Sequence, residues 1–158
     1  MQQWEMDTIR CFYAKEGQVL AFDIQKQALE STRALLKSEG MEQKARLILD
    51  SHENMAKYAD EASVDGICFN FGYLPGSDHS LATKPESSKN AVIEGLRLLK
   101  KGGVMSLCIY SGGETGFEER DTLLTYLKSL DEKKYLVIVS AYYNRKNNPP
   151  IPVLIIKK

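Results

Sequence analysis

Hydrophobic and polar residues alternate along this chain with two different periods. Short apolar runs of strand length occur at "QVLAFDI", "ARLILD", "VDGICFNF" and "VMSLCIYS". Between them lie stretches whose apolar residues recur every three or four positions, which indicates amphipathic helices. In residues 25–40 that helical face comprises Ala28, Leu29, Thr32, Leu35 and Leu36. Strands that alternate with helices predict an α/β fold, with strands paired in parallel through right-handed crossovers.

The remaining segments complete the predicted fold. "ESSKNAVIEGLRLLKKGG" predicts a helix that carries Lys100 and Lys101 near its C-terminus and Gly102 after it. "GFEERDTLLTYLKSL" predicts a helix with a leucine-rich inner face, and "ENMAKYADEA" predicts a shorter helix. At the end of the sequence, "YLVIVSAYY" and "PVLIIKK" flank the loop "NRKNNPPI" and predict an antiparallel pair of strands.

Composition limits the class of protein. With 158 residues, 43% of them hydrophobic, the chain suits one domain with a sizeable core. Its 21 basic and 21 acidic side chains cancel, so contact with nucleic acid would require a local basic face. The apolar runs are too short to span a membrane, and the N-terminus lacks a basic segment followed by an apolar one. We therefore expect a cytoplasmic protein.

The cysteines and histidines give no sign of a metal site. Cys11, Cys68 and Cys108 form an odd, widely spaced set without a CxxC pair, which indicates reduced thiols. Cys68 and Cys108 fall inside apolar strands, where a structural role is favoured over catalysis. The two histidines have no third ligand at a suitable spacing, so the sequence predicts no zinc site.

Asp23 and Gln25 follow the first apolar run, and ligands of open α/β sheets collect beyond the carboxyl ends of the strands. A carboxylate at this point can accept hydrogen bonds from both hydroxyls of a ribose. It can equally cap the helix that starts near Lys26. Ribose-binding folds place a glycine-rich loop about 20 residues before such an acid. No glycine precedes Gly17 in this chain.

The second run ends in "DSHEN", residues 50–54. Asp50 or Ser51 can cap the helix that follows. His52 is placed to lie beside a purine ring in the cleft that Asp23 faces, or it is a structural or solvated histidine.

The third run leads into "NFGYLPGSDHS", residues 70–80, which contains Asn70, Tyr73, Asp78 and His79. Its length and composition favour a functional loop over a plain connector. The neighbours Asp78 and His79 suggest an acid/base pair, although adjacency in sequence does not require that their side chains face each other.

The last two strand-end segments are rich in glycine and in aromatic and basic residues. In "SGGETG", residues 111–116, the glycines suit a phosphate cradle, a lid or a simple turn. In "YYNRKNNPPIP", Tyr143, Arg145 and Lys146 precede a stiff Asn-Asn-Pro-Pro turn that starts at Asn147. Aromatic stacking beside a basic pair suits a splayed RNA base and its phosphate, while a solvated hairpin loop explains the same residues.

Taken together, "AFDIQ", "DSHENM", "NFGYLPGSDHS" and "NNPPIPVLIIKK" resemble the rRNA methylase family of small bacterial class I S-adenosylmethionine (SAM)-dependent methyltransferases. That family includes the tRNA 5-(aminomethyl)-2-thiouridine methyltransferase, which acts at the wobble position. The resemblance covers nearly the whole chain from Asp7 onward, and "NFGYLPGSDH" is its most specific string.

The resemblance implies a Rossmann-like class I fold, SAM as the cofactor, a homodimer, and the anticodon region of a tRNA as the partner. It implies that Asp23 holds the ribose of SAM with Gln25 nearby, and that Ser51 and His52 border the adenine. Asn70 occupies the strand-end position from which such enzymes approach the methyl donor and acceptor.

On the substrate side the candidates are Tyr73, Asp78, His79, Tyr143, Arg145 and Asn147. The implied reaction is an in-line transfer of a methyl group from sulfonium to an amine. The sulfonium already activates the leaving group, so the protein mainly aligns the reactants. Because the amine must lose a proton to expose its lone pair, we expect Asp78 or His79 to act as the base, with Asn70 beside them.

The chain departs from the family pattern at its start. The family has a first strand and then a loop of the form D-A-T-x-G-N-G-x-D-T. Asp7 and Thr8 match the end of that loop, which makes Asp7 a candidate cofactor ligand, but residues 3–6 read "QWEM" where the glycine-asparagine part would fall. The resemblance therefore predicts one N-terminally truncated methyltransferase domain over residues 1–158, lacking the first central strand and the glycine loop.

Loss of a central strand removes pairing partners and apolar cover, so we expect weak SAM affinity. Three interpretations stay open. The chain is a fragment from a misplaced start or a frameshift, it is intact but degenerate, or its remaining strands close up or receive a strand from a partner. The alternatives to tRNA methylation are an rRNA or small-molecule methyltransferase and a non-catalytic remnant that binds RNA or a protein.

Overall fold

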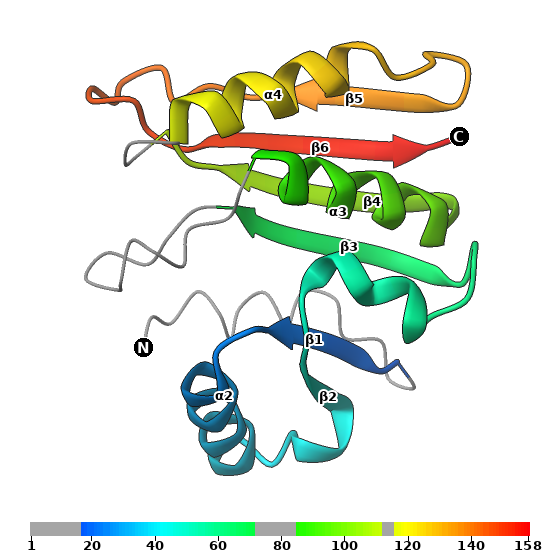
Figure 1. Cartoon of the computed structure of the whole chain (residues 1–158), viewed down its shortest axis with the longest axis vertical. Coiled ribbons are helices and arrows are strands. Elements are labelled where there is room, and N and C mark those ends of the chain that lie inside the picture. Colours follow the sequence, from blue (N-terminus) through cyan, green and yellow to red (C-terminus); the bar gives the residue numbers. More distant parts are fainter. Residues whose placement is uncertain (1–16, 72–84, 112–115) are drawn as a thin grey trace. The chain divides into compact units, whose positions relative to one another are not determined.

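The computed structural model describes residues 17–71, 85–111 and 116–158, which divide into two compact units (Figure 1). The first unit ends at Asn54 and the second begins at Met55. The strands form two sheets, a two-stranded sheet of order β1-β2 and a four-stranded sheet of order β3-β4-β6-β5. The single domain predicted over residues 1–158 stays a prediction. No helix in the described part of the chain is long and apolar enough to cross a membrane.

The first unit is a parallel pair of strands with one helix between them in sequence. β1 (Val19–Asp23) pairs with β2 (Ala45–Leu49) in the register that sets Asp23 opposite Leu49. α2 (Lys26–Ser38) and a 3₁₀ turn, η1 (Glu42–Lys44), connect them. Parallel pairing through a helical connection is as the sequence predicts.

The predicted apolar face of α2 is confirmed, because Leu29 and Leu36 are buried. The hydroxyl of Thr32 donates to the carbonyl of Ala28 at 3.0 Å. Gly40 follows the helix with a left-handed φ of 66°, and the N–H of Met41 donates to the carbonyl of Leu36 at 2.8 Å. This closure of the last turn requires the positive φ that glycine adopts without strain.

The second unit contains the rest of the elements in chain order. They are β3 (Val64–Phe71), α3 (Pro85–Leu98), β4 (Leu99–Ile109), α4 (Gly116–Lys128), β5 (Tyr135–Val139) and β6 (Ile151–Lys157). β3 and β4 pair in parallel, while β6 lies antiparallel to both β4 and β5. The predicted antiparallel C-terminal pair is therefore confirmed. The short helix predicted around residues 53–62 is instead a 3₁₀ segment, η2 (His52–Lys57), which starts and ends earlier.

The predicted C-terminus of the third helix is wrong. α3 ends at Leu98, and Lys100, Lys101 and Gly102 belong to β4. Leu98 and Leu99 are both buried, so the helical spacing of apolar residues runs on into the strand without a polar break. Gly102 has a left-handed φ of 80° and lies within β4 where the pairing with β3 shifts register between Val64 and Gly66.

The helices α3 and α4 lie on one face of the four-stranded sheet (Figure 1). Side chains alternate across the strands, so the buried residues Phe69, Met105, Leu107, Ile109 and Ile155 point to that covered face. α3 approaches closely at Gly95, where an added Cβ would lie 2.6 Å from Cε of Met105. On the leucine-rich inner face predicted for α4, Leu123 and Leu127 are buried and Leu124 is half-buried, while Leu130 lies beyond the end of that helix and is half-buried.

The opposite face of the same sheet carries the alternate residues of each strand. Cys68 and Asn70 of β3 are exposed there, and Cys108 of β4 is half-buried. In β6, Leu154 is 37% exposed. The two thiols lie inside strands, as the sequence predicts.

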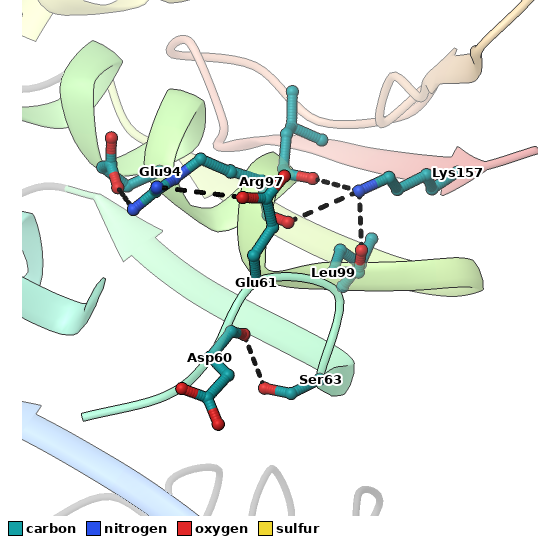
Figure 2. A network of polar contacts seen from close by, with 8 residues as sticks. Asp60, Glu61, Ser63, Glu94, Arg97, Leu99 and Lys157 are labelled. Atoms are coloured by element: carbon teal, nitrogen blue, oxygen red, sulfur yellow. Dashed lines mark hydrogen bonds and ion pairs between the residues drawn. The ribbon is translucent and has the colours of Figure 1, made fainter. Parts of the chain in front are cut away.

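Polar contacts gather where β3 and β4 begin, which we call the amino end of the four-stranded sheet. The ammonium of Lys157 donates to the carbonyls of Leu96 and Leu99, at 2.8 and 2.7 Å. Figure 2 shows Lys157 pointing toward Leu99 and Arg97. Arg97 pairs with Glu94 at 2.8 Å and lies 4.0 Å from Glu61. Lys157 therefore satisfies carbonyls that the end of α3 leaves without intrahelical partners.

Candidate functional site

Four of the predicted cofactor ligands lie at one edge of the two-stranded sheet. Asp23 is the last residue of β1 and lies opposite Leu49, the last residue of β2. Because the strands are parallel, Asp23 and Gln25 leave the sheet at the same edge as Ser51 and His52. The structure thus brings together, within the first unit, the residues that the strand-end rule selected.

Asp23 does not cap the helix amides of α2. Its Oδ1 accepts the N–H of Gln25 at 2.7 Å, while Gln25 is the N-cap residue and has no side-chain capping bond. The other oxygen, Oδ2, makes no hydrogen bond to the described part of the chain. Asp23 is half-buried. A carboxylate fixed through one oxygen, with the second oxygen at a strand end, fits the hydroxyls of a ribose.

Asp50 and Ser51 organise the turn after β2. Oδ1 of Asp50 accepts the N–H of Ser51 and the side-chain amide of Asn54, both at 2.7 Å. The hydroxyl of Ser51 accepts the N–H of Glu53 at 3.3 Å. The capping interpretation is therefore confirmed for Ser51, whose hydroxyl accepts a backbone N–H of η2, while Asp50 bonds to Ser51 and to the side chain of Asn54.

Burial lowers the pKa of His52 below its ordinary value of 6.5, and the negative charge of Glu53 opposes this shift only in part. The imidazole is therefore neutral at pH 7. A neutral ring can lie against a purine without the cost of removing a charge from water. The polar groups at this edge, a carboxylate that accepts hydrogen bonds and a neutral imidazole, fit an adenosine.

A second group of polar and aromatic residues lies where β3 and β4 end, which we call the carboxyl end of the four-stranded sheet. Asn70 is exposed and lies opposite Cys108 in the ladder. Tyr110 follows β4, and its N–H donates to the carbonyl of Phe71 at 3.3 Å, so the backbone pairing continues past the strand. Strand alternation sets Tyr110 and Cys108 on one face.

Tyr110 was not among the predicted site residues. Its side chain is hydrogen-bonded to that of Cys108 and is 38% exposed. Burial raises the pKa of Tyr110, and Cys108 and then Tyr142 raise it further. Burial likewise raises the pKa of Cys108. The period-2 pattern of "LCIYS" was the available signal, since it sets Cys108 and Tyr110 on the face of Asn70.

The loop between β5 and β6 lies at the same carboxyl end, because Ile151 at the start of β6 pairs with Ile109 at the end of β4 (Figure 1). The side chain of Tyr143 is fully exposed. Arg145 and Lys146 are exposed beside it.

The Asn-Asn-Pro-Pro turn in this loop has left-handed backbone at both asparagines. Asn147 and Asn148 have φ angles of 65° and 49°. Asparagine tolerates this left-handed backbone better than other side chains do. The aromatic and basic residues are thus presented to solvent on a defined turn.

Several predicted site residues lie outside the described residues. They are Asp7, Tyr73, Asp78 and His79, together with residues 3–6, where the glycine loop was expected. Within the three described segments, no group of three or more His, Cys, Asp or Glu side chains could hold a metal ion.

Comparison with known proteins extends the resemblance over nearly all of the chain. A family model described as "Putative rRNA methylase" matches residues 19–156. An Arabidopsis thaliana protein named "tRNA (mnm(5)s(2)U34)-methyltransferase, chloroplastic" is 34% identical over 143 residues. That match covers 88% of this chain and 51% of the plant protein, so the chain spans about half the length of this curated relative.

Solved structures share the fold. A protein from Clostridium thermocellum is 40% identical, with a TM-score of 0.89 over 96% of this chain and 82% of that one. A Streptococcus mutans protein in complex with S-adenosylhomocysteine (SAH) is 35% identical, with a TM-score of 0.81 over 89% of this chain and 76% of that one. An rRNA methylase from Streptococcus thermophilus is 32% identical, with a TM-score of 0.74 over 89% and 73%.

Proposed function

Because this chain belongs to the rRNA methylase family of SAM-dependent methyltransferases, we propose that it methylates an amine on the wobble uridine of a tRNA. The predicted family and class I methyltransferase fold are confirmed. SAM is the cofactor of the family, and one solved relative is bound to its demethylated product, SAH.

The loop between β5 and β6 is the feature that supports an RNA as the substrate. It presents Tyr143, Arg145 and Lys146 to solvent at the carboxyl end of the four-stranded sheet, where Asn70 also lies. Base stacking on an aromatic ring beside a cation that meets a phosphate is the usual way in which proteins bind single-stranded RNA. An anticodon loop offers such unpaired bases.

The choice of a tRNA wobble uridine is supported by the printed name of the Arabidopsis relative. That name specifies a uridine at position 34 that carries an amine on its 5-substituent. An rRNA or a small molecule as the acceptor is the alternative.

In this proposal the first unit holds the adenosine part of SAM. Asp23 accepts hydrogen bonds from the ribose with Gln25 nearby, and Ser51 and the neutral His52 border the adenine. Asp7 is a further candidate ligand. When bound, SAM supplies a methyl group on a sulfonium that leaves readily.

The reaction requires that the chain orient the acceptor amine and accept its proton. The acceptor amine must lie in line with the methyl group, and we assign Asn70 to orient it. As the amine nitrogen bonds to the methyl carbon, the carbon–sulfur bond breaks and SAH remains. The proton released by the amine passes to Asp78 or His79 in our assignment, while Tyr73 and Asn147 contact the substrate.

The test is methylation of tRNA that carries 5-(aminomethyl)-2-thiouridine, read by mass spectrometry of the nucleosides. We expect one added methyl group on that nucleoside with the wild-type chain, and a large loss with Asp78→Ala or His79→Ala across the pH range. If both variants keep wild-type turnover, the assignment of the base is wrong.

Calorimetry with SAH separates the other outcomes. SAH binding without tRNA methylation would favour an rRNA or small-molecule acceptor. Loss of SAH binding in the wild-type chain would favour a non-catalytic protein, in line with the weak cofactor affinity that the sequence predicts. The expected homodimer is tested by light scattering of the same sample.

A further inference from the structure

Asn70, Cys108, Tyr110 and Tyr142 form a group that we call the carboxyl-end cluster. We propose that Tyr110 and Tyr142 form the stacking surface for the acceptor base, with the amide of Asn70 at the edge of that base. This inference rests on the proposed function and names the residues that hold its substrate.

The first support is placement. Asn70 and Cys108 are ladder partners in β3 and β4, and Tyr110 lies two residues beyond Cys108 on the same face. The hydrogen bond between the side chains of Cys108 and Tyr110 agrees with that alternation. The ring of Tyr110 therefore stands beside Asn70 at the end of the ladder.

The second support is that the ring of Tyr110 is held in place while it remains accessible. Cys108 engages its hydroxyl group, and its N–H is bonded to the carbonyl of Phe71. Its side chain is nevertheless 38% exposed. A fixed, exposed aromatic ring loses little conformational entropy when a planar ligand stacks on it.

The third support is Tyr142, a second tyrosine at the carboxyl end of the four-stranded sheet. Tyr142 lies two residues beyond Ser140, whose N–H donates to the carbonyl of Pro152, and Pro152 is the ladder partner of Cys108. Tyr142 is 48% exposed, and it adds to the rise in the pKa of Tyr110. Two phenol rings, one directly after β4 and one in the loop after β5, offer flat surface to a base. In the sequence Tyr142 directly precedes Tyr143, so the surface continues into the exposed loop with Arg145.

The amide of Asn70 suits the edge of a stacked uracil. An asparagine side chain has one acceptor oxygen and two donor hydrogens. The edge of a uracil ring presents a donor N–H between acceptor oxygens, so one amide can satisfy an adjacent donor and acceptor. Aromatic stacking fixes the plane of the base, and hydrogen bonds from Asn70 would fix its orientation within that plane.

The experiment uses an anticodon stem-loop RNA that carries 5-(aminomethyl)-2-thiouridine at the wobble position, and the same RNA with an abasic wobble nucleotide. Binding is measured by fluorescence anisotropy in the presence of SAH. We expect wild-type protein to prefer the base-containing RNA by about 10- to 100-fold, the factor that stacking on aromatic side chains provides.

The variants separate base contact from a general role. Tyr110→Ala should abolish the preference and raise KM for the RNA by a similar factor, while SAH affinity stays unchanged. Tyr110→Phe keeps the ring and should keep most of the preference. Tyr143→Ala should weaken both RNAs equally, because that residue lies farther along the loop.

The outcomes bear differently on the two proposals. If Tyr110→Ala retains the wild-type preference while the wild-type chain methylates the RNA, the stacking assignment is overturned and the proposed function stands. If Tyr110→Phe loses as much as Tyr110→Ala, the hydroxyl matters and the stacking assignment is likewise overturned. If the wild-type chain methylates no RNA, the proposed function fails and this inference fails with it.

Discussion

The two ends of the four-stranded sheet use polar residues in opposite ways. At the amino end, charged side chains bond to the chain itself: Lys157 to the carbonyls of Leu96 and Leu99, and Lys100 to Asp65 at 2.8 Å. At the carboxyl end, Asn70 and Tyr143 are exposed to solvent.

The difference follows from the geometry of parallel strands. Both ends of such a sheet must connect to helices, but ligands collect beyond the carboxyl ends. Polar groups at the amino end are thus available to stabilise the fold. Those at the carboxyl end are kept accessible at some cost in stability.

One buried contact near the carboxyl end does not fit this division. Ser88 in the first turn of α3 is hydrogen-bonded to the carboxylate of Glu119 in the first turn of α4, and both side chains are buried. The helices that start at the carboxyl end are therefore tied to each other beneath the surface. This buried contact stabilises the carboxyl end of the sheet and leaves the exposed residues there accessible to solvent.

The largest expected effect is at this buried contact. Ser88→Ala leaves the carboxylate of Glu119 buried without its hydroxyl partner, and we expect a loss of about 3 kcal/mol in the free energy of unfolding. Urea denaturation measures it. Ser129→Ala, which removes an exposed hydroxyl from the end of α4, is the control and should cost less than about 0.5 kcal/mol. Equal effects of the two variants would show that the buried contact contributes nothing special.

The next effect is at the amino end. Lys157→Met keeps the apolar stem but removes the donor to two carbonyls, so we expect a loss of about 1 to 2 kcal/mol. Its neighbour Lys158 donates to the exposed carbonyl of Glu132 at 2.8 Å, and Lys158→Met should cost about 0.5 kcal/mol or less. A larger loss from Lys158→Met than from Lys157→Met would contradict the role of this end.

A smaller effect is expected midway between the ends. In Gly95→Ala, the new Cβ meets Cε of Met105 at 2.6 Å and Cδ1 of Ile67 at 3.2 Å. Overpacking costs about 1 to 3 kcal/mol, while alanine in place of glycine in a helix gains about 1 kcal/mol. Methionine can move, so we expect a net loss near 1 kcal/mol in thermal or urea unfolding. Adding Met105→Leu should reduce that loss, and no change in the double variant would locate the clash elsewhere.

The smallest effect is at the ion pair between Lys100 and Asp65, whose side chains are 44% and 86% exposed. Exposed pairs contribute about 0 to 1 kcal/mol, and salt screens them. Lys100→Ala should change stability by less than about 0.5 kcal/mol. A double-mutant cycle with Asp65→Ala should give a coupling that disappears at about 1 M salt. A coupling that persists would mean that this pair is more than a surface contact.

The sequence predicted the strands better than the helix ends. "VDGICFNF" coincides with β3 (Val64–Phe71), because an apolar run of strand length bounded by polar segments leaves little ambiguity. The change from α3 to β4 was missed, since Leu98 and Leu99 are apolar and buried on both sides of the boundary. The spacing of apolar residues along the sequence does not reveal a change from helix to strand that falls between two adjacent apolar residues.

The site was predictable only where a simple rule applied. The strand-end rule found Asp23, His52 and Asn70, because each follows or ends an apolar run. Tyr110 was missed because its importance depends on the neighbouring strand and on a loop 32 residues later in the chain. The contact between Ser88 and Glu119 spans 31 residues, and no local pattern marks it.

The position of β6 has a consequence for how the second unit is made. β6 is the last described strand in sequence, yet it lies between β4 and β5 and pairs with both. During synthesis, β5 emerges before the strand that connects it to the sheet. β5 then has no native partner until the ribosome has passed Lys157, so we expect the unit to fold late, with β5 and the open edge of β4 exposed to chaperones first.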